Sequence, residues 1–86
     1  MFRLTETERT GEGMVLRVEG RVIGPWVTEL RQACERVLST GGTLALDLSD
    51  LWFIDGDGVA LLRRLKERNV TVANCPLFIT EQLEET

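Results

Sequence analysis

The stretch that decides the fold of this chain is its centre, where residues 46–62 read LDLSDLWFIDGDGVALL. The two leucines at its start stand two residues apart, which is the spacing of one face of a β-strand. A turn rich in Asp and Gly follows at 55–58, and beyond it apolar residues recur every three residues, as on one face of a helix. We predict from this stretch a strand at 43–48, a loop at 49–54 and a helix at 59–68.

The N-terminal side of this stretch predicts a β-hairpin followed by a helix. Alternating apolar residues favour strands at 2–8 and 14–22, and the Gly-containing segment between them favours a turn. Pro25 suits the first turn of a helix, and apolar residues then recur at steps of three and four as far as Leu38. Two consecutive glycines, at 41 and 42, end that helix.

The C-terminal side adds a strand at 70–74 and a short helix at 76–84, which Pro76 opens. The order β-β-α-β-α-β-α contains two strand–helix–strand units, whose strands run parallel with right-handed crossovers. The opening hairpin is antiparallel, so the sheet is mixed. Because the strands alternate, we expect an α/β fold in which a small mixed β-sheet carries its helices mainly on one face.

Length and composition limit the classes of protein. The 86 residues suffice for a single domain, residues 1–86, and 43% hydrophobic with 28% charged residues is ordinary for a globular protein. The formal net charge is −4 and the basic residues are interleaved with Glu, which argues against a nucleic-acid partner. No apolar run approaches the roughly eighteen residues of a membrane span, and residues 1–10 lack an apolar signal core. We therefore predict a cytoplasmic protein without membrane insertion.

Residue types that often hold metals or act as general bases near neutral pH are scarce. Histidine is absent. Cys34 and Cys75 lack the spacing of a metal site, and we expect both to be reduced and partly buried. We predict no cofactor, no metal site and no catalytic residue.

The segment Asp55-Gly56-Asp57-Gly58 is open to three interpretations. Two acids separated by one residue after an apolar run resemble the first motif of haloacid-dehalogenase-type phosphotransferases, in which the first Asp attacks phosphorus and carboxylates hold Mg²⁺. A calcium loop would need a carboxylate at its twelfth position, which Lys66 occupies. A helix start explains every residue, because Asp57 caps the helix, the other acid complements its positive end and glycine permits the turn.

Taken in order, the motifs of the chain resemble those of the STAS family, in particular the anti-sigma factor antagonists. The resemblance runs from about residue 15 to residue 76. Four matches carry it. In the first half of the chain, Gly20-Arg21-Val22 matches a family strand that ends in Gly-Glu-Leu, and Glu29-Leu30-Arg31 matches a Glu-Leu-Arg motif in the first helix. In the second half, Leu46-Asp47-Leu48-Ser49 matches a Leu-Asp-Leu-Ser strand, and Phe53-Ile54-Asp55 with Gly58 matches a Phe-Ile-Asp-Ser-Ser-Gly loop.

The resemblance implies that Asp57 stands at a switch position. In the family, the residue just before the last Gly of the loop is a Ser or Thr, and its phosphorylation releases a kinase-like anti-sigma factor. Here that position is Asp57 and the preceding residue is Gly56, and neither has a hydroxyl. A phosphate would add about −1.5 to −2 charges, whereas Asp57 carries about one. We therefore expect the phosphorylation switch to be absent.

The resemblance also marks a partner-binding surface, made by residues 23–28 and 52–59. The residues that we expect to contact the partner are Ile23, Trp26, Thr28, Trp52, Asp55, Gly56, Asp57 and Gly58. The family often has an acidic residue where Ile23 stands, so we expect a partner, or a mode of control, other than the standard kinase. Trp is favoured at binding hot spots, but a loop Trp also covers cores, and both interpretations of Trp52 stay open.

The resemblance implies a non-catalytic bacterial regulator of transcription that binds a protein partner, either an anti-sigma factor or another regulatory subunit. A second hypothesis keeps the fold and makes the chain a STAS subunit that regulates a transporter ATPase. The third hypothesis is the Asp-based phosphohydrolase. The last helix is shorter than is usual in the family, which we expect to expose apolar surface near Leu77 and Phe78 and to favour a homodimer.

Overall fold

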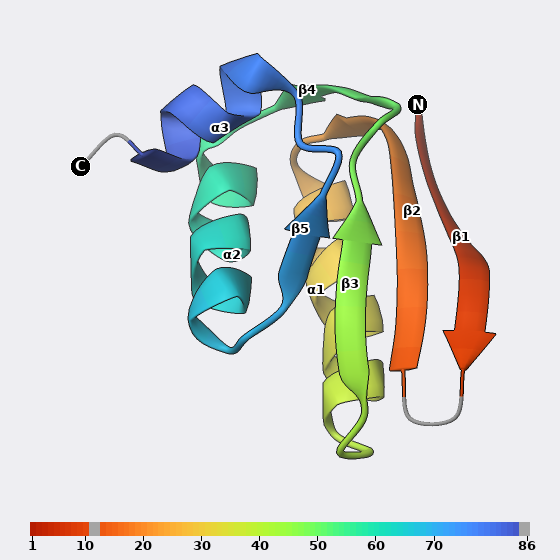
Figure 1. Cartoon of the computed structure of the whole chain (residues 1–86). Helices are drawn as coiled ribbons and strands as arrows, with labels where there is room; N and C mark the ends of the chain where they lie inside the picture. Colours follow the sequence, from red (N-terminus) through yellow and green to blue (C-terminus); the bar gives the residue numbers. More distant parts are fainter. Residues whose placement is uncertain (11–12, 85–86) are drawn as a thin grey trace.

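Five strands and three helices follow one another in the order ββαββαβα in the part of the chain that the computed structural model describes, residues 1–10 and 13–84 (Figure 1). The elements are β1 (Phe2–Thr10), β2 (Gly13–Val22), α1 (Pro25–Leu38), β3 (Thr43–Asp47), β4 (Leu51–Ile54), α2 (Gly56–Glu67), β5 (Thr71–Ala73) and α3 (Leu77–Glu84).

The strands form one mixed sheet around β2. On one side β2 pairs antiparallel with β1, and on the other it pairs parallel with β3, which in turn pairs parallel with β5. The strand β4 also runs parallel to β2, but it pairs with residues 20–22, beyond the part of β2 that pairs with β3. The C-terminal end of β2 therefore reaches past β3 and carries β4 (Figure 1).

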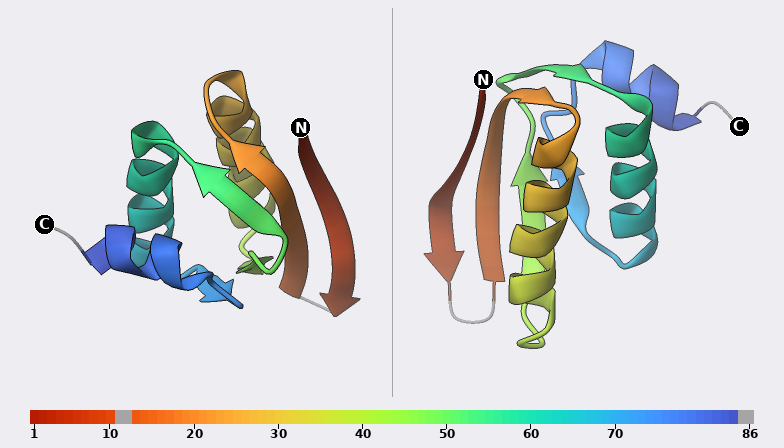
Figure 2. Two further views of the ribbon diagram at one scale, coloured as in Figure 1. Left: turned by 90° about the horizontal axis from the view of Figure 1, so that it is seen from above. Right: turned by 180° about the vertical axis from the view of Figure 1, so that it is seen from behind.

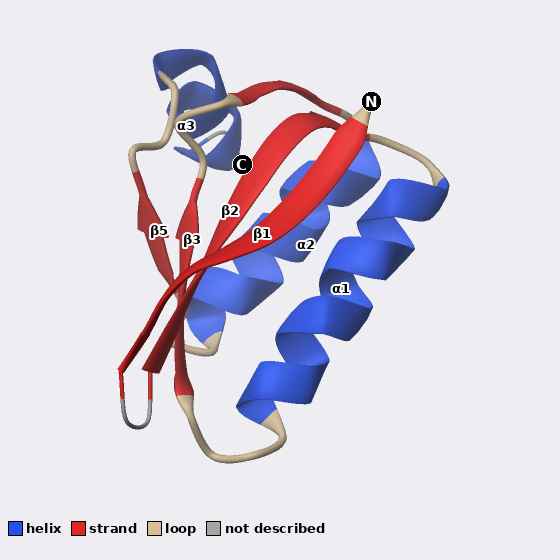
Figure 3. Cartoon of the chain, turned by 90° about the vertical axis from the view of Figure 1, so that its right-hand side faces the viewer, coloured by secondary structure: helices blue, strands red, loops and turns tan. Residues whose placement is uncertain are grey.

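The helices α1 and α2 cover one face of the sheet, and α3 packs on α2 at the end where β4 lies (Figures 2 and 3). Inward-facing leucines and valines of the strands meet the apolar sides of both helices, and the buried core of the described residues contains no polar or charged side chain. Burial of this apolar surface is the main term that stabilises the fold. The prediction of a small mixed sheet with helices mainly on one face is confirmed.

The largest differences from the prediction lie at 51–58, and the other boundaries agree to within two residues. The expected loop at 49–54 is wrong in its second half, which is the strand β4, and α2 begins at Gly56 instead of Val59. The strand β4 was missed because a run of four residues without regular alternation has no recognisable strand pattern. The start of α2 was placed too late because it depends on which Asp acts as the cap. None of the helices in the described residues is long and apolar enough to cross a membrane.

Candidate functional site

Asp55 joins the two segments that were expected to bind a partner. Its Oδ1 accepts the N–H of Gly58 at 2.8 Å, and its Oδ2 accepts the N–H of Gly24 at 3.1 Å. The N–H of Asp55 donates to the carbonyl of Val22 at 3.1 Å. One carboxylate therefore holds the turn before α1 against the first turn of α2, at the end of the molecule where β2 and β4 end.

The cap of α2 is Asp55 and not Asp57. Asp55 has an extended backbone (φ −91°, ψ 179°) and accepts from the third residue after it, which is the geometry of an N-cap. Asp57 lies in the first helical turn and is exposed, where its negative charge complements the positive end of the helix. The helix-start interpretation of the segment holds, but the expected capping role of Asp57 is wrong.

The carboxylate of Asp57 lines a shallow hollow of about 270 Å³ between α1 and α2. The other residues of this hollow come from both helices and from the turn before α1, and they are Gly24, Val27, Thr28, Arg31, Ala60 and Arg64. Asp57 makes no ion pair in the described part of the chain. Asp57 therefore shares this hollow with two arginines, Arg31 and Arg64.

A β-bulge exposes two adjacent aromatic side chains on β4. Gly20 pairs with Leu51 and the next residue of β2, Arg21, pairs with Phe53, so Trp52 is an extra residue in β4. The extra residue breaks the alternation of the strand. As a result Leu51 is buried, whereas Trp52 and Phe53 are 55% and 49% exposed.

The guanidinium of Arg21 lies over the Trp52 ring, 4.5 Å from its centre. This is a cation–π contact, worth about 0.5–1 kcal/mol at an exposed site. The contact orients the indole, and Trp52 is still 55% exposed. Trp52 therefore does not cover the core, and that alternative is excluded by its exposure.

The remaining predicted residues of the surface differ in what they present. Thr28 and Gly56 are exposed, and Ile23 is half-buried. Trp26 is half-buried and stacks on Phe2, with 5.9 Å between ring centres, so part of its ring stabilises the attachment of β1.

Gly58 is buried, and a Cβ at this position would lie 2.5 Å from Cγ1 of Ile54. It contributes its N–H to Asp55 and no surface.

Sequence reasoning missed three residues of this region, namely Arg21, Arg31 and Arg64, and it placed Phe53 within the predicted surface without singling it out. Arg31 and Arg64 follow Thr28 and Asp57 by one and two helical turns, so helical spacing from the predicted residues would have found them. The exposure of Phe53 depends on the bulge, and no local pattern indicates a bulge here.

The carboxylates do not gather as a metal site. Within residues 1–10 and 13–84, no group of three Cys, Asp or Glu side chains is arranged to hold a metal ion. Asp55, which would be the nucleophile in the phosphotransferase interpretation, uses both carboxylate oxygens as acceptors for main-chain N–H groups. Its observed role is to position two turns.

A mixed sheet with helices on one face, and an Asp-capped helix after a short strand at its end, define a STAS-type domain. A family model described as Mlab, STAS domain, matches residues 5–84, and the chain therefore belongs to the STAS family.

Among solved structures, the anti-sigma factor antagonist SpoIIAA in its unphosphorylated form is similar to this chain, with a TM-score of 0.74 and 23% sequence identity. That match covers 98% of this chain and 82% of the other, and it supports the fold. No curated protein matches the sequence.

Proposed function

We propose that this chain is a non-catalytic regulatory module that binds a protein partner without phosphorylation at the switch position. The partner surface consists of residues 23–28 together with residues 52–59. The observation that carries the proposal is the double hydrogen bond of Asp55, to Gly24 at 3.1 Å and to Gly58 at 2.8 Å, which holds both segments on one surface.

The exposed aromatic residues of β4 support a binding role for this surface. Trp52 and Phe53 stand side by side in sequence, and about half of each side chain is exposed. Trp is enriched among residues that dominate interface energies. Because Arg21 already orients the indole, little side-chain entropy is lost when a partner covers it.

The residue types at positions 56 and 57 support binding that phosphorylation does not switch on or off. Neither Gly56 nor Asp57 has a hydroxyl that a kinase can phosphorylate. Asp57 places a constant carboxylate in the first turn of α2, beside Arg31 and Arg64. Phosphorylation of a hydroxyl at this position therefore does not control the binding of the partner.

A second candidate is a STAS subunit that regulates a transporter ATPase. The lack of a phosphoacceptor hydroxyl at residues 56 and 57 favours it over regulation by an anti-sigma kinase. Both candidates use the same surface, and the identity of the partner separates them.

The test begins with co-purification of the tagged protein from its native cells, beside Asp57→Ser and Trp52→Ala variants. We expect the natural chain and Asp57→Ser to retrieve the same protein. The purified partner is then titrated against each variant. Trp52→Ala is expected to weaken binding by about 30-fold or more, as for a hot spot of at least 2 kcal/mol.

The control is Phe78→Ala, which removes an exposed aromatic ring on α3, outside the surface defined above. We expect it to leave the affinity within about twofold, well under the tenfold that corresponds to 1.4 kcal/mol. If only Asp57→Ser retrieved an anti-sigma kinase, Asp57 would act as a fixed mimic of the phosphate. The natural chain would then be an antagonist that is permanently unable to bind the kinase. Phosphate transfer from ATP to residues 56–58 would contradict the proposal.

The enzymatic alternative has its own test. Mg²⁺-dependent hydrolysis of a generic phosphoester such as p-nitrophenyl phosphate, abolished by Asp55→Asn, would replace the binding proposal with the phosphohydrolase hypothesis. We expect no turnover above the buffer rate.

A further inference from the structure

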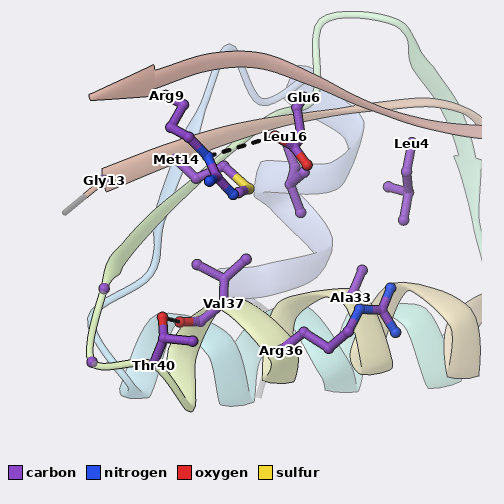
Figure 4. Close-up of a pocket in the computed structure, with 12 residues that line it drawn as sticks. Leu4, Glu6, Arg9, Gly13, Met14, Leu16, Ala33, Arg36, Val37 and Thr40 are labelled. Carbon is purple, nitrogen blue, oxygen red and sulfur yellow. Dashed lines mark hydrogen bonds and ion pairs between the residues drawn. The ribbon is translucent and has the colours of Figure 1, made fainter. Parts of the chain in front are cut away.

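A second hollow lies at the other end of the molecule from Asp55, between the β1–β2 hairpin and α1 (Figure 4). It exists because α1 packs against β2 and β3, while β1 is the edge strand on the far side of β2. The inward face of β1 therefore has no helix directly above it. The resulting cavity, here called the β1–α1 trough, has a volume of about 820 Å³.

Apolar side chains line part of the trough, beside polar ones. Leu4, Met14 and Leu16 line it from the strands, and Ala33 and Val37 line it from α1 (Figure 4). Three of these side chains, those of Leu4, Met14 and Val37, are only half-buried, so part of their apolar surface faces water. Glycines at 13, 41 and 42 border the trough without side chains and leave it open.

Two arginines and one glutamate line the trough. Arg9 comes from β1 and Arg36 from α1, on opposite walls (Figure 4). Arg9 is 3.8 Å from Glu6, and both side chains of this pair are more than half exposed, so the pair is weak. The guanidinium of Arg36 makes no ion pair within the described residues. Among the described residues that line the trough, the arginines outnumber the glutamate by one, in a chain of net charge −4.

We propose that the β1–α1 trough binds a single-chain amphiphile with an anionic head, of the fatty-acid class. The volume falls within the roughly 300–1,000 Å³ of small-molecule sites, and such sites combine apolar walls with a few polar groups. The chain lies along Leu4, Met14 and Val37, and the flexible Met14 adapts to its shape. The head is held by the guanidinium of Arg36, with Arg9 on the opposite wall, because guanidinium pairs strongly with carboxylate.

This site is independent of the proposed partner surface. The hairpin and the C-terminal end of α1 lie at one end of the molecule, and β4 with the first turn of α2 lies at the other (Figure 1). A bound amphiphile therefore leaves residues 52–59 free. The domain then has one site for a partner and one for a small ligand.

The test uses the full chain with three monomeric probes of equal chain length, each below its micellar concentration: decanoate, decyl maltoside and decyltrimethylammonium. Binding is followed by amide chemical shifts in NMR. We expect saturable binding of decanoate with shifts at Leu4, Met14, Ala33 and Val37. The neutral and cationic probes are expected to bind about tenfold more weakly or worse, which is the value of one charge-assisted contact.

Two variants locate the site. Arg36→Glu is expected to lower the affinity for decanoate by about tenfold or more. Arg3→Glu makes the same change of charge on β1 at an exposed position that does not line the trough, and we expect it to change the affinity less than about twofold. Val37→Phe places a bulkier side chain in the trough and is expected to weaken decanoate binding by about tenfold or more. Circular dichroism checks that this variant folds.

Several results would overturn the proposal. Equal binding of all three probes would show an unspecific apolar surface. Decanoate shifts confined to residues 52–59 would place the ligand elsewhere. Binding to anionic vesicles without binding of monomeric decanoate would indicate a membrane surface as the occupant, and trough shifts on simple dilution would indicate a second copy of the chain.

Discussion

Asp55 and Asp57 stand two residues apart, yet their carboxylates do different things. Asp55 is half-buried and accepts two main-chain N–H groups, whereas Asp57 is exposed and faces the hollow between the helices. The two glycines between and after them differ in the same way. Gly56 is exposed with nothing within 4 Å of a Cβ, and Gly58 is buried against Ile54 and Val22.

This difference predicts opposite effects for the same substitution. Gly56→Ala is expected to raise the free energy of unfolding by up to about 1 kcal/mol, because it restricts the unfolded chain and meets no neighbour. Gly58→Ala is expected to lower it by about 1–3 kcal/mol, because the new Cβ would lie 2.5 Å from Cγ1 of Ile54. Urea denaturation of both variants checks the pair. Equal effects would mean that residue 58 is not packed as described.

The two cysteines also differ at the residue scale. Burial raises the pKa of the Cys34 thiol to about 12, with a smaller contribution from the charge of Glu35. At pH 8 roughly one folded molecule in ten thousand then carries the Cys34 thiolate. Cys75 is half-buried and free. We expect a disulfide reagent to modify Cys75 first and Cys34 only as fast as the chain unfolds. In Cys75→Ala the fast phase should vanish, and its persistence would contradict this assignment.

At the scale of elements, β4 is the segment whose position most affects the candidate surface. Its bulge turns Trp52 and Phe53 outward together while Leu51 stays in the core. The helix that follows begins at once, because Asp55 is both the residue after the strand and the cap of α2. The end of β4, the cap of α2 and one segment of the proposed partner surface are therefore a single local structure.

Removing the cap is expected to loosen α2 and the turn before α1 together. Asp55→Ala loses the cap, worth about 1 kcal/mol, and the hydrogen bond from Gly24, worth about the same. We therefore expect a loss of about 2 kcal/mol in the free energy of unfolding. Asp55→Asn keeps an acceptor for Gly58 but offers an N–H₂ group to Gly24, so its loss should be about half as large. If Asp57→Asn were as costly as Asp55→Ala, the cap would be misassigned.

At the scale of the whole molecule, one face of the sheet carries α1 and α2 and the other face does not (Figure 3). The open face is held together by polar contacts at the strand ends. Asp47 at the end of β3 accepts the N–H of Ser49 at 3.0 Å and the side-chain amide of Asn74 at 3.2 Å. Arg17 of β2 pairs with Asp50. These contacts connect three segments that are distant in sequence.

The Asp47 contacts predict a contribution to acid sensitivity. The N–H of Ser49, and then the amide of Asn74, hold the pKa of Asp47 below its usual value. A carboxylate with a lowered pKa in the folded state stabilises the fold above its unfolded pKa of about 3.9, and this stability is lost as the pH falls through the folded pKa. We expect the stability difference between the natural chain and Asp47→Asn to be constant from pH 5 to pH 7 and to shrink below about pH 4. Urea titrations across this range measure it, and a pH-independent difference would contradict the hydrogen-bonded carboxylate.

Much of the fold could be predicted because its elements carry complete periodic patterns. The alternation of residues 14–22 and the helical spacing from Val27 to Leu38 each lie within one element, and they correspond to β2 and α1. The resemblance of residues 15–76 to the family added the two segments of the candidate surface. Asp55 does hold these segments together, but the partner contacts themselves stay a prediction.

The sequence by itself determined the class of fold, the membership of the family and the absence of a hydroxyl at residues 56 and 57, because these depend only on residue type and spacing. Tertiary structure alone decided that Asp55 and not Asp57 is the cap, that Trp52 and Phe53 both face outward, and that a trough lies under β1. The bulge depends on the register of β2 and β4, and the cap depends on which N–H groups the fold brings within reach of a carboxylate. The trough forms where α1 does not cover β1. Each of these depends on residues far apart in the chain, and no local pattern contains that information.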